Sequence, residues 1–383
     1  MTFLNPIKAI IFYLMVILGI CFNLLFAITP AVPFIFLNRR FYLRWCSFAL
    51  GYYLLMITCL LEDLLGIKII LTGDDLTNDK TRSIIVLNHR TRLDWLYAWT
   101  LQSRFQILSQ LKIVMKAGLK SMPALGWACQ HAGYLFLHRQ WENDQERINN
   151  IIGYYKSCQS PLSLLIFPEG TNLTNETKIK SNNYASKQKT YNRIYEYCLH
   201  PHVTGFAYLV NAMRSNEIVD AIDDVTIGYE GQFPITELDL LKGRFPKVVH
   251  FHIKRYNINE LPQDSEQIGD WLRKCWDEKE NRLKEFYEKK QFDSPTKRLN
   301  NERMESTVRF QRRLALVICT LFILFWSYCI IAFVKIKFYV VLVCIFHWVM
   351  ESYTNGVIDF VCQLDANYRR QQQQQQQPAI RQD

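Results

Sequence analysis

A histidine and an aspartate follow directly after a short apolar segment of the chain. Residues 83–87 (SIIVL) have the composition of a short buried strand, and the polar run after them contains Asn88, His89 and Asp94. In open α/β folds, binding and catalytic side chains collect where strands end. A histidine side chain titrates near pH 6.5, so it can accept a proton near neutral pH. An aspartate on its other ring nitrogen would fix the tautomer and stabilise the imidazolium.

The five-residue gap limits where this pair can lie. On one continuous helix of 3.6 residues per turn, His89 and Asp94 would point to different faces. We therefore expect His89 in a loop and Asp94 in the first turn of the following helix. The pair lacks a partner serine, so a substrate hydroxyl would be the nucleophile and no acyl-enzyme is expected. The alternative is a surface histidine beside an aspartate that caps a helix.

Three further stretches end apolar runs or form polar turns: residues 133–139 (GYLFLHR), 167–171 (FPEGT) and 199–206 (LHPHVTGF). Arg139 presents a planar set of donors suited to a phosphate, and Lys116 is a second phosphate candidate. Gly170 lets the backbone approach a ligand closely, and Thr171 can donate to an oxygen. Glu169 could orient Arg139 or accept a hydrogen bond from a hydroxyl. Taken singly, these residues also fit a surface arginine and an ordinary Pro-Gly turn.

Taken together and in this order, the four stretches resemble the glycerolipid acyltransferases related to 1-acylglycerol-3-phosphate acyltransferase, whose first signature is NHxxxxD. The segments NHRTRLDW, HPHVTGF, HFHIKRY and CWDEKENRLKEFY are most similar to the lysocardiolipin and lysophosphatidylinositol acyltransferase branch. The resemblance covers roughly residues 80–290. It implies an enzyme that transfers a fatty acyl chain from acyl-CoA, a co-substrate, to a hydroxyl of an anionic lysophospholipid, with no cofactor.

The resemblance also implies the roles of single residues. His89 and Asp94 would be catalytic, and the substrate-binding set would be Asn88, Lys116, Arg139, Glu169, Gly170 and Thr171. One position departs from the family pattern, because Asn172 stands where many phosphatidic-acid-forming members have an arginine. This favours a larger headgroup, although Lys178 or Lys180 could compensate. The alternatives are a 1-acylglycerol-3-phosphate acyltransferase, a thioesterase and a non-catalytic membrane scaffold.

The elements that must position these residues are strands alternating with helices, which predicts a three-layer α/β acyltransferase domain with a mixed sheet over residues 76–290. The clearest strands are 83–87, 134–138, 162–167 and 248–253, and the clearest helices are 141–157 and 264–289. We expect membrane segments in residues 1–75 and 314–362. A basic linker at 291–313 and a low-complexity tail at 363–383 complete the predicted organisation.

Four apolar blocks without a charged residue indicate a membrane protein: 9–38, 45–61, 314–334 and 338–350. The first and third reach the ~20 residues that a spanning helix needs. The second has 17 residues and ends in acids, so we expect a re-entrant or interfacial segment. The basic loop at Arg39, Arg40 and Arg44 would lie in the cytosol, with the polar domain on the same side. Glycosylation at Asn172 or Asn175 would contradict this topology.

The charge and the cysteine pattern exclude some classes of protein. A net charge of +10 favours anionic lipid or phosphorylated substrates, and the lack of a basic tract interleaved with aromatics argues against nucleic acid. The eleven cysteines contain no C-x-x-C pair, and the histidines at 200, 202, 250 and 252 have no acidic or cysteine partner at ligand spacing, so we expect no metal. The family resemblance implies the endoplasmic reticulum membrane, with a mitochondria-associated membrane as the alternative.

Overall fold

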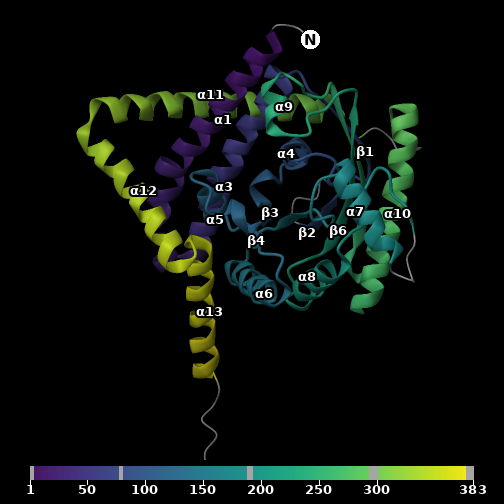
Figure 1. The fold of residues 1–383 in the computed structure, drawn as a ribbon. Coiled ribbons are helices and arrows are strands. Elements are labelled where there is room, and N and C mark those ends of the chain that lie inside the picture. Colours follow the sequence, from purple (N-terminus) through teal and green to yellow (C-terminus); the bar gives the residue numbers. More distant parts are fainter. Residues whose placement is uncertain (1–3, 77–80, 188–192, 293–298, 300–301, 377–383) are drawn as a thin grey trace, which may run out of the picture.

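The computed structural model describes residues 4–76, 81–187, 193–292, 299 and 302–376. In this part of the chain, seven strands form one sheet in the order β1-β7-β6-β2-β5-β3-β4 (Figure 1). The strands are β1 (Lys68–Gly73), β2 (Ser83–Leu87), β3 (Leu111–Lys116), β4 (Leu135–Leu137), β5 (Ser163–Ile166), β6 (Ala221–Glu230) and β7 (Val248–Asn257). Every neighbouring pair is parallel except β6 with β7, so the predicted mixed sheet is confirmed.

Strand direction determines where the site can form. Strands β2, β3, β4, β5 and β6 run in the same direction, so their carboxyl ends lie at one edge of the sheet. The loops that leave β2, β5 and β4 begin at Asn88, Phe167 and His138 and carry polar residues from three of the stretches that the sequence singles out. Chain segments far apart in sequence therefore meet at this edge, which we call the catalytic edge because the candidate catalytic residues His89 and Asp94 lie there.

Helices cover both faces of the sheet. Successive side chains of a strand point to opposite faces of the sheet, so the contacts of β6 show which helices cover each face. Its residue Asp224 pairs with Lys279 of α10 (Ser265–Lys289), whereas Tyr229 contacts Tyr97 of α4 (Asp94–Arg104). Helices α6 (Trp141–Cys158) and α8 (Val203–Ser215) lie on the α10 side. Shorter helices connect the layers: η4 (Leu108–Gln110), η5 (Ala117–Leu119), α5 (Leu125–His131), α7 (Asn175–Ser186), α9 (Glu237–Leu241) and η6 (Ile258–Glu260).

Among the described residues, three helical segments are long and apolar enough to cross a membrane: Leu4–Ala31, Arg39–Leu64 and Met304–Ala332. The first comprises α1 (Leu4–Phe22), η1 (Asn23–Ile28) and η2 (Thr29–Ala31). The short helix α2 (Phe34–Leu37) leads into α3 (Arg39–Cys59), which η3 (Leu60–Leu64) extends to form the second. The second helical segment has 26 residues, so it is longer than the 17-residue apolar block at 45–61 suggested. Its acidic end is neutralised, because Glu62 pairs with Arg104 at 2.8 Å.

The C-terminal part contains more helix than the sequence suggested. Helix α11 (Glu302–Ala332) begins inside the segment expected to be a linker, and α12 (Val334–Thr354) follows it to form the V-shaped pair in Figure 1. Two glutamates in the first turn of α11 favour a helix start there. The expected tail is helical as far as residue 376 in α13 (Val357–Gln376), whose Asp365 is held by Ser157 of α6 at 2.7 Å.

Candidate active site

His89 and Asp94 are in direct contact at the catalytic edge. His89 lies in the loop after β2, and α4 begins at Asp94, which is the arrangement that the five-residue gap predicted. The distance from His89 Nδ1 to Asp94 Oδ2 is 2.9 Å. The Asp94 side chain is fully buried, whereas 17% of the His89 side chain is exposed. No hydrogen bond from the described residues occupies the other ring nitrogen of His89, Nε2, which is therefore available to a substrate.

The buried Asp94 carboxylate is held by other donors besides the histidine. The backbone N–H of Thr91 donates to Oδ2 at 2.9 Å, and the hydroxyl of Tyr229, at the end of β6, donates to Oδ1. Burial, reinforced by the Asp94 carboxylate, holds the pKa of Tyr229 well above its usual value. The Tyr229 hydroxyl thus stays protonated and remains a donor. Sequence reasoning missed Tyr229, because it lies 135 residues from Asp94.

Glu169 of the FPEGT turn is also buried, with 2% of its surface exposed. Its Oε1 accepts from the backbone N–H of His89 and from the indole of Trp276, both at 3.2 Å, and its Oε2 accepts from the backbone N–H of Leu199 at 3.1 Å. Burial raises the pKa of Glu169 to about 7, although the nearby His89 and these donors favour the charged form. Its carboxylate therefore joins three loops of the fold, and Trp276 is a second contributor that the sequence did not reveal.

The FPEGT turn is braced by the fourth polar stretch. Besides Leu199, the backbone N–H of His202 donates to the carbonyl of Pro168 at 2.8 Å. Gly170 has φ +72°, a left-handed conformation that favours glycine, and a Cβ there would approach the His202 ring to 3.0 Å. The stretch LHPHVTGF, to which the sequence gave no role, thus holds the turn that follows β5.

The cationic residues lie on the exposed side of the catalytic edge. Arg139 donates through Nη2 to the carbonyl of Gly170, so β4 and the FPEGT turn meet here. Lys116 is the exposed last residue of β3 and is paired in register with Leu137, two residues before Arg139. Thr171 is also exposed. These three side chains are exposed, so their predicted contact with a substrate stays a prediction.

Asn88 and the lysines near Asn172 have other partners. Asn88 is 1% exposed, and its amide exchanges two hydrogen bonds with the backbone of Ile227 in β6, at 2.8 and 3.3 Å. This amide joins β2 to β6 and does not face solvent. Lys178 pairs with Glu196 and Lys180 with Glu176, both at 2.5 Å, so both candidate replacements for the missing arginine are already paired. Among the described residues, no group of three or more His, Cys, Asp or Glu could hold a metal ion.

Comparison with known proteins identifies the family of the chain. The family model Acyltransferase matches residues 68–230, and Acyltransferase C-terminus matches residues 239–322. Lysocardiolipin acyltransferase 1 of Gallus gallus is 42% identical over 282 residues, which cover 73% of this chain and 74% of that protein. Lysophosphatidylinositol acyltransferase 10 of Caenorhabditis elegans is 37% identical over 246 residues, covering 63% and 62%.

The chain belongs to the acyltransferase family. Within that family, its similarity is to the lysocardiolipin and lysophosphatidylinositol acyltransferase branch, which confirms the resemblance noted from the motifs. The protein is an acyltransferase with helices suited to a membrane.

Proposed function

We propose that this enzyme transfers a fatty acyl chain from acyl-CoA to a hydroxyl of an anionic lysophospholipid, monolysocardiolipin or lysophosphatidylinositol, in the remodelling of membrane lipids. The observation that carries the proposal is the 2.9 Å contact between His89 Nδ1 and the buried Asp94, in a histidine whose side chain is 17% exposed. The names of the relatives support the choice of acceptor.

The reaction needs one proton to move twice. Nε2 of His89 takes the proton of the lipid hydroxyl as its oxygen attacks the thioester carbonyl of acyl-CoA. Asp94 stabilises the imidazolium that forms. When the tetrahedral intermediate collapses, the C–S bond breaks and the imidazolium returns the proton to the sulfur, which leaves as free coenzyme A. The product is a new ester, and no acyl-enzyme is formed.

The substrate phosphate would be bound by the exposed cations of the catalytic edge. Arg139 can present two parallel N–H groups to a phosphate, and Lys116 adds a second positive charge nearby. Gly170 and Thr171 offer a close backbone approach and a hydroxyl. Asn88 and Glu169 contribute indirectly, because their polar atoms hold the loops in place.

Acyl transfer in isolated membranes tests this proposal. Microsomes containing wild type, His89→Ala or the control His252→Ala would receive labelled acyl-CoA with lysophosphatidic acid, lysophosphatidylinositol or monolysocardiolipin. His252 lies on β7 and contacts Thr72 of β1 at 3.1 Å, so its loss spares the site. We expect product with wild type and the control, and about 10²- to 10⁴-fold less with His89→Ala.

The acceptor profile separates the alternatives. Preference for lysophosphatidic acid would indicate a 1-acylglycerol-3-phosphate acyltransferase. Loss of acyl-CoA without an acceptor would indicate a thioesterase, and no product with any acceptor from a folded, abundant protein would indicate a scaffold. We further propose an endoplasmic reticulum location with the catalytic edge on the cytosolic side. A mass shift on endoglycosidase treatment, from glycans at Asn172 or Asn175, would contradict that orientation.

A further inference from the structure

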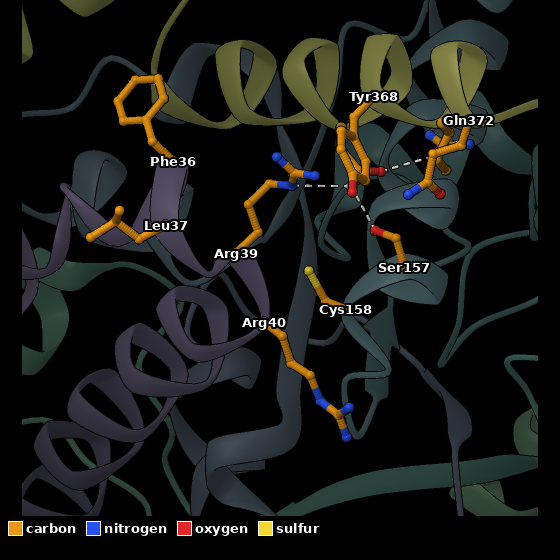
Figure 2. A pocket seen from close by; sticks show the side chains of 10 residues that line it. Phe36, Leu37, Arg39, Arg40, Ser157, Cys158, Tyr368 and Gln372 are labelled. Atoms are coloured by element: carbon orange, nitrogen blue, oxygen red, sulfur yellow. Dashed lines mark hydrogen bonds and ion pairs between the residues drawn. The ribbon is translucent and has the colours of Figure 1, made fainter. Parts of the chain in front are cut away.

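A basic pocket lies away from the catalytic edge, where α2 joins α3. Its cavity has a volume of about 440 Å³, and ten residues line it: Phe36, Leu37, Arg39, Arg40, Ser157, Cys158, Asp365, Tyr368, Arg369 and Gln372. Figure 2 shows Arg39 extending toward the helix that carries Tyr368 and Gln372, with Phe36 and Leu37 beside it. We call it the Arg40 pocket.

The Arg40 pocket has an excess of positive charge. Three arginines and one aspartate line it, which leaves two positive charges. Asp365 is 1% exposed and already accepts from Arg369 at 2.8 Å and Ser157 at 2.7 Å, with Arg39 at 3.4 Å. Arg40 is exposed, and no ion pair with another described residue neutralises it. The pocket can therefore take an anion without displacing the internal contacts of Asp365.

The surroundings of the pocket are apolar and exposed. Phe36 and Leu37 are 66% and 76% exposed, although both line the pocket. Along α3, an outward row of aromatic rings continues from this point, with Phe41 and Trp45 at 6.3 Å and Trp45 and Phe48 at 6.2 Å between ring centroids. Exposed aromatic side chains next to arginines are typical of helix ends at a membrane–water interface. The pocket also lies between two of the candidate spans, Leu4–Ala31 and Arg39–Leu64.

The pocket is distinct from the catalytic edge. Helix α6 begins at Trp141, two residues after Arg139, and ends at Cys158, which lines the pocket. At 1.5 Å per residue, its 18 residues separate the two places by about 27 Å. A phosphate bound in the Arg40 pocket therefore cannot be the one that Arg139 would hold.

We propose that the Arg40 pocket binds the phosphate headgroup of an anionic diacyl phospholipid of the surrounding membrane. Arg40, which no described residue neutralises, would bind the phosphate, while Arg39 and Arg369, both paired with Asp365, add positive charge to the lining. The acyl chains would lie along Phe36, Leu37 and the aromatic row of α3. Basic pockets beside membrane helices recognise anionic headgroups in this way, and the cavity volume is within the usual range for a ligand site. The bound lipid would fix the turn between the first two candidate spans against α13.

Native mass spectrometry of the purified full chain in neutral detergent tests this inference, with diacyl phosphatidylglycerol as the probe. We expect Arg40→Gln to raise the apparent Kd by about fivefold, since one basic side chain near a membrane surface contributes about that much. The matched control is Arg44→Gln, one turn further along α3 and outside the pocket lining, which should change the Kd less than about twofold. Arg139→Gln should leave the Kd unchanged.

A second variant, Leu37→Gln, tests the contact with the acyl chains of the lipid without changing the charge of the pocket. Leu37→Gln keeps all arginines at a position that is 76% exposed, so folding should be preserved. We expect it to weaken phosphatidylglycerol binding. Equal losses in Arg40→Gln and Arg44→Gln would mean diffuse surface charge and overturn the proposal. A loss in Arg139→Gln instead would place the lipid at the catalytic edge, and displacement by millimolar inorganic phosphate would make free phosphate the ligand. Either result also overturns it.

Discussion

The first residue of α4, Asp94, and the turn after β5, which contains Glu169, each supply a buried carboxylate that accepts three hydrogen bonds, and both carboxylates hold His89. Asp94 binds the imidazole ring of His89 at 2.9 Å, whereas Glu169 accepts from its backbone N–H at 3.2 Å. The other partners of Asp94 are a backbone N–H and a tyrosine hydroxyl. Those of Glu169 are a backbone N–H and an indole.

Asp94 and Glu169 differ in whether the group that each holds changes charge during the reaction. The ring held by Asp94 becomes positive when it takes a proton, so the Asp94 carboxylate stabilises a state formed only in the reaction. The three N–H groups held by Glu169 keep the same charge throughout. We therefore expect Asp94 to determine the rate and Glu169 to determine the stability of the fold around His89.

The largest expected effect is that of Asp94→Asn on turnover. An amide in place of the carboxylate can donate to Nδ1 of His89, which favours the tautomer with the proton on Nε2 and removes the base. We expect kcat to fall by about 10³- to 10⁴-fold. The measurement is kcat at saturating acceptor, with the thermal unfolding midpoint as a control. A loss below tenfold in a folded variant would mean that Asp94 does not orient the base.

Glu169→Gln should lower the stability of the fold and leave kcat nearly unchanged, the opposite of Asp94→Asn. The new side chain can still accept at one oxygen but directs an NH₂ group at a former donor, such as the backbone N–H of Leu199. One buried N–H without an acceptor costs about 1–3 kcal/mol of stability. We expect a lower midpoint of thermal unfolding at pH 5 with kcat within about threefold of wild type. A large loss of kcat at an unchanged midpoint would place Glu169 in contact with substrate instead.

The stability difference between wild type and Glu169→Gln should also depend on pH. Burial raises the pKa of Glu169 from 4.5 to about 7, so the protonated form is favoured in the folded state. Its contribution to stability is complete below pH 4.5 and is lost as the pH rises through 7. The difference in unfolding free energy between wild type and Glu169→Gln should therefore narrow by up to about 3 kcal/mol over this range. Parallel unfolding curves at pH 5 and pH 8 would contradict it.

The surroundings of Asp94 and those of Glu169 are not equally predictable from the sequence. The start of α4 at Asp94 and the strands β2 and β5 follow local patterns of apolar residues and spacing, so the dyad could be placed in advance. The partners of Glu169 could not, because Trp276 lies 107 residues away and only the packing of α10 brings it close. Local sequence carries no signal for such a contact.

The role of a conspicuous polar residue was also hard to predict. Asn88 belongs to the motif and was expected to bind substrate, yet its amide joins β2 to β6. Similarly, the polar residues near the C-terminus suggested a tail, but glutamine is tolerated in helices, and Asp365 fixes α13 to α6. In both cases the hydrogen-bond partner, which depends on the tertiary structure, decides what the residue does.

The smallest expected effect is that of removing the Tyr229 hydroxyl, which holds Asp94 in place without changing its charge. Tyr229→Phe removes one hydroxyl that donates to Asp94 Oδ1 and leaves the ring packed against Tyr97. Losing one hydrogen bond to a charged group should lower kcat by about fivefold. A kcat equal to that of wild type would mean that Tyr229 supports only the packing of β6 and does not hold Asp94 for its role in the reaction.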